Sequence, residues 1–387
     1  MMTNVCDPTL LAEVRKYGSF DVSGCFNCGS CTLGCVLSTD HASFPRRQTR
    51  QVLMGLKQMV LSSLEPWMCH DCGDCSTVCP RETKPRDGMA TLRRYIASHY
   101  DWTGITAKIN SSKIRYIGSL SFVAVLVLFL AVAYHVYMVK MPLSDFASTP
   151  MPLKHMFPMM THFTLAVVLL PLFFLLSFAV RMYRFTMRGT EKMTMAPNLY
   201  FTEAKTFLYH LTTHKKMGEC HEKSRWPKHL VLAWGVMIKL SLLVFALSWF
   251  QTDKLYQISH PQRWIGYLIT AFIIYGAADI LVSRLRKKKE VYKSSDMWDW
   301  TFPILLLAAA ISGIVVHIVR YAGFELATHY AYAVHIMISV PLLVIEMPFG
   351  KWTHMIYRPM ALYFQSIKEK ALQKQWSVQG VPSHVAS

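Results

Sequence analysis

The chain has 387 residues, 52% of them hydrophobic, and a formal net charge of +18. That length allows two or three domains, and so high a hydrophobic content, gathered in long blocks, excludes a wholly soluble protein. A solvated basic face on the cytoplasmic side of a membrane explains the charge better than a nucleic-acid interface does. The first 18 residues are polar and charged without an apolar signal core, so we expect the N-terminus to stay inside the cell.

Two cysteine motifs with the same spacing lie near the N-terminus. They read Cys25-x2-Cys28-x2-Cys31-x3-Cys35 and Cys69-x2-Cys72-x2-Cys75-x3-Cys79-Pro80. In such repeats three cysteines hold one [4Fe–4S] cluster, and the fourth holds the other cluster because it starts a short helix that points away. The predicted ligands are Cys25, Cys28, Cys31 and Cys79 for cluster 1, and Cys69, Cys72, Cys75 and Cys35 for cluster 2.

Zinc and disulfides are the competing interpretations of these cysteines. Zinc sites seldom use four cysteines in so short a run, and disulfides do not suit a chain without a secretory signal. Eight of the ten cysteines belong to the two motifs. The other two, Cys6 and Cys220, are expected to be plain unpaired thiols.

Two amphipathic helices are expected beside the motifs. Apolar residues recur at helical spacing across 46–64 and again across 88–99, where Met89, Leu92, Tyr95 and Ile96 would face inward. Such helices would exclude water from the clusters, which influences their reduction potentials. The sequence thus predicts a soluble, α-helical, two-cluster ferredoxin-like domain over 1–105.

Six apolar segments follow, each long enough to cross a membrane. They cover about 114–138, 157–181, 229–250, 264–284, 301–321 and 329–348. Arg and Lys cluster after the second and fourth segments, which marks those loops as cytoplasmic. We therefore expect a six-helix bundle over 106–354 in the cytoplasmic (inner) membrane. Both termini, the iron–sulfur domain and a tail over 355–387 would lie in the cytoplasm.

Histidines stand out within these apolar segments. His229 opens the third segment, His317 and His335 lie in the fifth and sixth, and His135 and His162 lie near the outer ends of the first two. Polar residues at membrane depth are costly and usually functional. A b-type haem in a helical bundle needs two axial ligands from facing helices. The pattern therefore predicts a transmembrane cytochrome b with at least one haem.

Nearly the whole chain resembles a family of fused redox subunits. The cysteine block is similar to the C-type iron–sulfur subunit of heterodisulfide reductases. The six segments are similar to the E-type cytochrome subunit of those enzymes and, more distantly, to the cytochrome b of respiratory nitrate reductases. The similarity is specific in the cysteine block and in His335-x12-Pro348-Phe349-Gly350-Lys351-Trp352-Thr353-His354. The fused order and length resemble the C-type subunit of the quinone-interacting membrane-bound oxidoreductase (Qmo) complex of sulfate-reducing bacteria.

This resemblance implies axial ligands for one or two haems. It assigns an inner haem to His229 and His335 and leaves His317 for an outer haem. Lys239 stands ten residues after His229, where the nitrate reductase cytochrome has its second histidine, so the partner of His317 is open. The alternatives are Lys239 as a neutral amine, an outer histidine (His162 or His135), or no outer haem.

The resemblance also implies a quinone-reactive subunit of a multi-subunit oxidoreductase. It would carry electrons between menaquinol or menaquinone and soluble flavin and iron–sulfur subunits, toward adenylylsulfate reductase in sulfate respiration. Candidates for the proton acceptor at the quinone site are His135, His155, His162 and His317 on the outer side, and Asp279 and Glu346 on the inner side. Two rivals are the membrane arm of a heterodisulfide reductase and a non-redox membrane anchor, although the intramembrane histidines argue against the anchor.

Overall fold

A computed structural model describes residues 6–38, 43–134, 136–137, 157–187, 195–252 and 254–378 of the chain. Within these ranges the regular structure is helical and no strand is formed. The candidates His135 and His155 lie outside the described residues. The mainly α-helical fold predicted from the sequence is confirmed.

The N-terminal part, residues 6–110, is called the head below. Its helices are α1 (Leu10–Arg15), α2 (Ser30–Leu33), α3 (Arg46–Leu53), α4 (Lys57–Ser62), α5 (Glu65–Met68), α6 (Asp74–Thr77), α7 (Pro85–Tyr100) and α8 (Ile105–Asn110). Helix α7 is central, and the four side chains predicted to face inward from it are all buried. The helix expected over 88–99 is therefore confirmed.

The single helix expected over 46–64 is instead broken into α3 and α4. Gly55 lies between them with a φ of +70°, a conformation that side chains other than glycine adopt at a cost. A Cβ at this position would approach the backbone of Asp7 to 2.4 Å. The turn therefore needs glycine, which helical periodicity alone does not detect.

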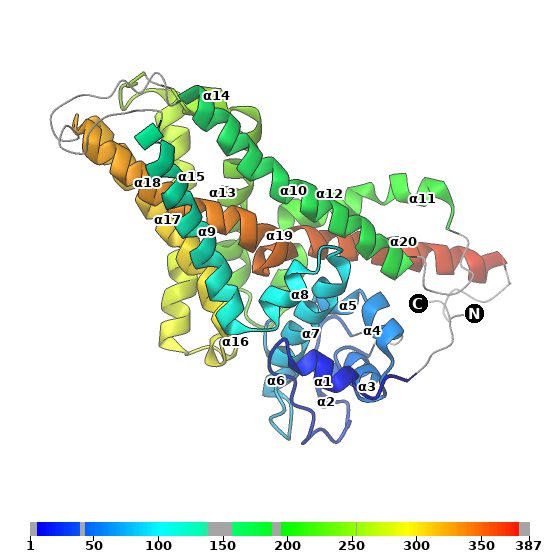
Figure 1. Cartoon of the computed structure of the whole chain (residues 1–387). Coiled ribbons are helices and arrows are strands. Elements are labelled where there is room, and N and C mark those ends of the chain that lie inside the picture. The colour runs from blue at the N-terminus through cyan, green and yellow to red at the C-terminus, as the bar shows by residue number, and fades with distance from the viewer. Residues whose placement is uncertain are drawn as a thin grey trace.

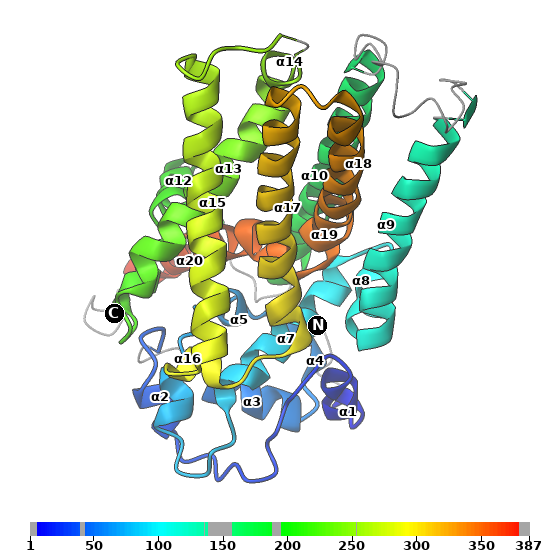
Figure 2. The same cartoon turned by 90° about the vertical axis from the view of Figure 1, so that its left-hand side faces the viewer.

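Six helices form the bundle and are long and apolar enough to cross a membrane. They are α9 (Lys113–Tyr134), α10 (Phe157–Met187), α13 (Arg225–Phe245), α15 (Pro261–Arg286), α17 (Met297–Tyr321) and α18 (Glu325–Pro341). At Pro341 the last helix continues through a π turn, η5 (Leu342–Glu346), into α19 (Met347–Phe349). The six helices run together, with the head beyond one end of the bundle (Figures 1 and 2).

Short elements join these parts, and one long helix crosses between them. The short ones are α11 (Pro197–Thr202), α12 (Ala204–Thr213), η4 (Lys215–Glu219), α14 (Leu247–Phe250), α16 (Glu290–Lys293) and η6 (Lys351–Thr353). Helix α20 (His354–Val378) runs crosswise between the bundle and the head (Figure 1) and packs against α12 and α5. It buries Tyr357, Ala361 and Ile367 in the same core as the head. The expected tail thus contains a packed helix.

Buried arginines fasten the head to the bundle. Arg86 of α7 donates hydrogen bonds to the carbonyls of Glu290 (3.3 Å) and Ser294 (3.0 Å), which belong to the segment between α15 and α17. Arg358 of α20 donates to the carbonyl of Cys69 at 2.7 Å. Hydrogen bonds from charged donors contribute more than neutral ones. The second cysteine motif is therefore held against the bundle.

Candidate electron-transfer sites

The two cysteine motifs fold into loops of the same shape. In each loop the residue before the second cysteine and the glycine after it have a positive φ: Asn27 (57°) and Gly29 (90°), then Asp71 (57°) and Gly73 (93°). Asn, Asp and Gly are the residue types that accept this left-handed conformation most readily. Helices α2 and α6 begin directly after the glycines, so the repeated sequence produces a repeated geometry.

Two cavities gather the cysteines, and each motif contributes to both. Cys25, Cys28, Cys31 and Cys79 line one cavity, and Cys35, Cys69, Cys72 and Cys75 line the other. Helices α2 and α6 pack against each other, which carries the last cysteine of each motif to the opposite cavity. Four converging thiols are the donor set of a [4Fe–4S] cluster, so both cavities fit one.

The surroundings of the two cavities differ. The first is lined by head residues and lies near the surface, where Phe26 is 72% exposed beneath the guanidinium of Arg81. The second is enclosed and also lined by Cys220, which precedes α13 and is buried. Cys220 was expected to be a plain unpaired thiol; it forms no disulfide, and its Sγ lies within 4.8 Å of the Cys72 Sγ. Nothing in the sequence near Cys220 indicates this contact.

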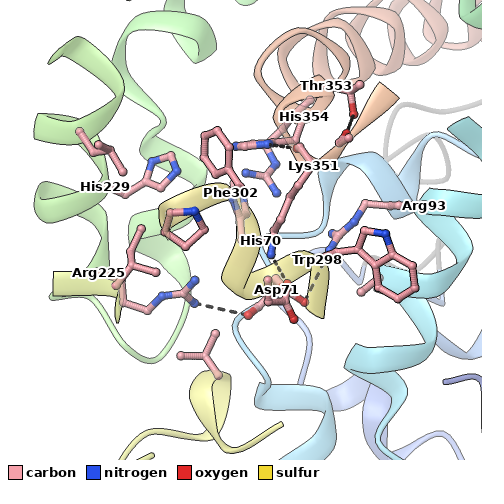
Figure 3. A pocket seen from close by; sticks show the side chains of 18 of the residues that line it. His70, Asp71, Arg93, Arg225, His229, Trp298, Phe302, Lys351, Thr353 and His354 are labelled. Atoms are coloured by element: carbon pink, nitrogen blue, oxygen red, sulfur yellow. Dashed lines mark hydrogen bonds and ion pairs between the residues drawn. The ribbon is translucent and has the colours of Figure 1, made fainter. Parts of the chain in front are cut away.

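A cavity of about 200 Å³ separates the second cysteine loop from the bundle. Figure 3 shows Asp71 of that loop between Arg225 of α13 and Arg93 of α7. The Arg93 guanidinium lies 3.5 Å from the Asp71 carboxylate, and Arg225 donates to the Asp71 carbonyl. Burial alone would raise the pKa of Asp71, but Arg86 and Arg93 hold it well below its usual range. The loop therefore keeps the Asp71 carboxylate ionised among arginine side chains.

Two imidazoles face each other across this cavity. The ring centres of His229 in α13 and His354 at the start of α20 are 6.4 Å apart, and Figure 3 shows both at the cavity wall. His354 Nδ1–H donates to the Lys351 carbonyl at 2.6 Å, which leaves Nε2 with its lone pair. Burial lowers the pKa of His354 to about 3, so the ring is neutral. This is the tautomer that a metal-ligating histidine adopts when a carbonyl orients it.

The separation of these rings fits an iron between them. Two metal–imidazole bonds of about 2.0–2.1 Å place the ring centres roughly 6 Å apart. Apolar side chains of Leu232, Phe302 and Trp352 line the adjoining space. His214 also lines this space, with its Nδ1 atom 3.2 Å from the Nδ1 atom of His229. The residues present therefore fit an axially ligated haem.

His229 and His335, which were predicted to share a haem, have different neighbours in the structure. His229 contacts His214 and His354, whereas His335 contacts Ser312 of α17 through Nδ1 at 3.0 Å. His335 and His229 lie at different depths of the bundle. After His335 the chain passes through the rest of α18, η5 and η6, and only then does His354 reach the depth of His229. His354 ends the motif that carries the resemblance, but the sequence does not indicate that it faces His229.

Lys239 was one of the alternatives for the partner of His317, and the structure gives the two residues different neighbours. Lys239 lies near His335, and no hydrogen bond or ion pair to Lys239 is found in the described parts of the chain. His317 has both ring nitrogens engaged, one by Arg263 and one by Tyr267. The geometry thus associates Lys239 with His335 rather than with His317.

The remaining candidates for a quinone site are dispersed. Asp279 pairs with Lys228 at 2.6 Å and lines the cavity near His229. Glu346 is fully buried and accepts the Lys351 N–H at 3.1 Å. A Cβ on Gly350 would meet its carboxylate at 2.3 Å, so glycine makes room there. His162 is an exposed residue of α10.

The fold and the two cysteine cavities define an iron–sulfur electron-transfer protein with helices that can cross a membrane. Residues 21–83 match the 4Fe-4S dicluster domain. The chain is 37% identical over 76 residues to a CoB–CoM heterodisulfide reductase iron–sulfur subunit of Methanocaldococcus jannaschii, covering 20% of this chain and 40% of that protein. It is 27% identical over 88 residues to a protein of Archaeoglobus profundus that is itself similar to the C-type heterodisulfide reductase subunit, covering 22% and 47%.

These matches have a limited extent. The chain spans less than half the length of these relatives, and the matched segment is about a fifth of the chain. No solved structure matches the chain. The similarity of the cysteine block to the C-type subunit of heterodisulfide reductases is confirmed. Relatives of this kind are named as subunits of heterodisulfide reductases.

Proposed function

We propose that this protein carries electrons between a membrane quinone and soluble redox subunits through haem b and two [4Fe–4S] clusters. The observation that carries the proposal is the order of the sites. The His229–His354 pair, the cavity with Cys69 and the cavity with Cys25 follow one another from the bundle into the head. His70 lines both the histidine cavity and the adjacent cysteine cavity, so these two sites are neighbours.

The crossed cysteine scheme is part of this proposal. Cluster 1 takes Cys25, Cys28, Cys31 and Cys79, and cluster 2 takes Cys69, Cys72, Cys75 and Cys35. The two sets of lining residues support it. A cluster held by four thiolates exchanges one electron without a change of ligands. The enclosed cavity favours cluster 2 as the site that exchanges electrons with the bundle.

The inner haem is assigned to His229 and His354. When bound, the haem supplies a one-electron carrier beside cluster 2. Arg225 and Arg358 line the same cavity and would hold the haem carboxylates by charge-assisted hydrogen bonds. Leu232 and Phe302 line the cavity and would exclude water from a bound haem, and the Lys351 carbonyl fixes the tautomer of His354.

A second haem is assigned to His335 and Lys239. A lysine at mid-membrane costs about 2.5–3.5 kcal/mol when charged, whereas a neutral amine can donate its lone pair to a metal. Lys239 has no polar partner among the described residues, which agrees with a role as a neutral ligand. The alternative partners are His162 and His317, although the contacts of His317 with Arg263 and Tyr267 disfavour it as a ligand.

The quinone site and the wider context complete the proposal. Asp279 is the inner-side candidate for proton uptake because it lines the cavity beside His229.

Positive charge on the loops favours a cytoplasmic location for the head, both termini and α20. The corresponding division is an iron–sulfur domain over 1–105, a bundle over 106–354 and a C-terminal part over 355–387. The fused order supports a C-type Qmo protein, working with menaquinol, flavin-containing partners and adenylylsulfate reductase.

Anaerobic titration of the purified chain in detergent tests this function. A reduced-minus-oxidised spectrum should show b-type haem bands, and a menaquinol analogue should reduce first the haem and then the clusters. Cys25→Ser combined with Cys69→Ser is the control and should retain haem reduction without cluster signals. Intact clusters without haem bands would identify the rival, a non-redox anchor, and refute the proposal.

A further inference from the structure

Cys220 forms part of the enclosed cysteine cavity although it belongs to the bundle side of the chain. Its Sγ, the Sγ of Cys72 and a carboxylate oxygen of Asp74 all lie within 4.8 Å of one another. The side chain is only 3% exposed and lies against Cys72. The cavity thus contains five cysteines, one more than a [4Fe–4S] cluster requires.

The position of Cys220 is fixed by contacts of the residues that follow it. The next residue, His221, donates its backbone N–H to the Asp74 carboxylate at 3.2 Å. Further along, Arg225 donates to the carbonyl of Asp71 at 3.5 Å. The segment entering α13 therefore holds the loop that contains Cys72, and Cys220 is positioned by that contact.

A second observation indicates that the cavity holds a polar group. His70 lines it and is only 5% exposed, yet neither ring nitrogen has a hydrogen-bond partner among the described residues. Burying a polar group without a partner costs about 1–3 kcal/mol. A buried imidazole without a partner is expected where a ligand completes the site. Here that ligand would be the cluster with its sulfurs.

We propose that Cys220 is an additional cysteine of cluster 2 that binds no iron and donates an S–H···S hydrogen bond to the Cys72 sulfur. The four iron positions are already filled by the crossed scheme, on which this inference rests. Hydrogen bonds to cluster sulfurs set the reduction potential, because they stabilise the more negative, reduced state. The bundle thereby raises the potential of cluster 2 and leaves cluster 1, whose cavity Cys220 does not line, unaffected.

Redox titration followed by electron paramagnetic resonance tests this inference in the full-length chain. Cys220→Ala should keep the iron content and the cluster 1 signal unchanged and shift the cluster 2 midpoint potential downward. Cys220→Ser should shift it less, since the hydroxyl still donates to sulfur. Cys6→Ala, at the other cysteine outside the motifs, is the matched control and should shift neither potential.

The other outcomes refute the inference. Loss of cluster 2 iron in Cys220→Ser would make Cys220 a ligand, and an unchanged potential in both variants would make it a bystander. If Cys220→Ala does not fold, Cys220→Val takes its place, because valine fills the buried site and removes the donor. Absence of haem or of quinol reactivity would leave these readouts intact, so failure of the proposed function is distinguishable.

Discussion

The two cysteine cavities share their motif and loop geometry but not their surroundings. The first is near the surface, beside the exposed side chains of Phe26 and Leu33. The second buries Cys69 and Cys75 and is closed by Cys220 from the bundle side. The same ligand pattern can therefore serve two roles. The enclosed site is suited to exchange with the bundle, and the open site to exchange with a soluble partner.

The largest expected effect separates the cavities through the last cysteine of each motif. Cys79→Ser should abolish the same signal as Cys25→Ser, and Cys35→Ser the same signal as Cys69→Ser, since each pair lines one cavity. Electron paramagnetic resonance of the four variants measures this. If Cys79→Ser instead matched Cys69→Ser, each motif would hold its own cluster. The comparison of the two cavities as two cluster sites would then not apply.

The next effect concerns the bundle beside the enclosed cavity. His354→Ala and His229→Ala should each remove one haem, and the same one, because their rings face each other. His335→Ala is the comparison variant and should spare that haem. Haem content and the visible spectrum of each variant provide the measurement. Retention of all haem in His354→Ala would return the inner site to His335.

A smaller effect is expected at Lys239. Lys239→Met should alter the spectrum of the second haem or convert it to high spin, while cluster signals and the haem of His229 stay unchanged. The neighbouring polar residue Ser241, whose hydroxyl bonds its own helix backbone, gives the matched control Ser241→Ala. Two wild-type haem spectra in Lys239→Met would exclude the lysine and favour His162.

The smallest effect is on the attachment of the enclosed loop. Arg358→Ala leaves the Cys69 carbonyl without this donor, and the free energy of local opening around 65–72 should fall by about 1–3 kcal/mol. Hydrogen exchange of the amides in that segment measures it. Arg47→Ala, which removes a half-exposed partner of Glu65, should cost less than about 1 kcal/mol. Equal effects would argue against a specific role of Arg358.

Local patterns in the sequence identified the cysteine loops, the inward face of α7 and the six apolar helices. Cysteine spacing is local, and long apolar segments have one stable outcome in a membrane. The proximity of His229 to His354 could not be predicted, because the two are 125 residues apart in the sequence and only the path through η5 and η6 brings them together. Gly55, Cys220 and His70 were missed for the same reason, since their roles depend on neighbours distant in sequence.

Helix α20 begins with His354 and places Arg358 one turn later. Residues four apart lie on the same helical face, so one side chain reaches the cavity beside His229 while the other binds the carbonyl of Cys69. The separation between these two contacts is thereby set by a helical turn of about 5.4 Å. A single residue inserted between them would rotate one contact by about 100° relative to the other. The spacing of the two contacts therefore cannot change in small steps without losing one of them.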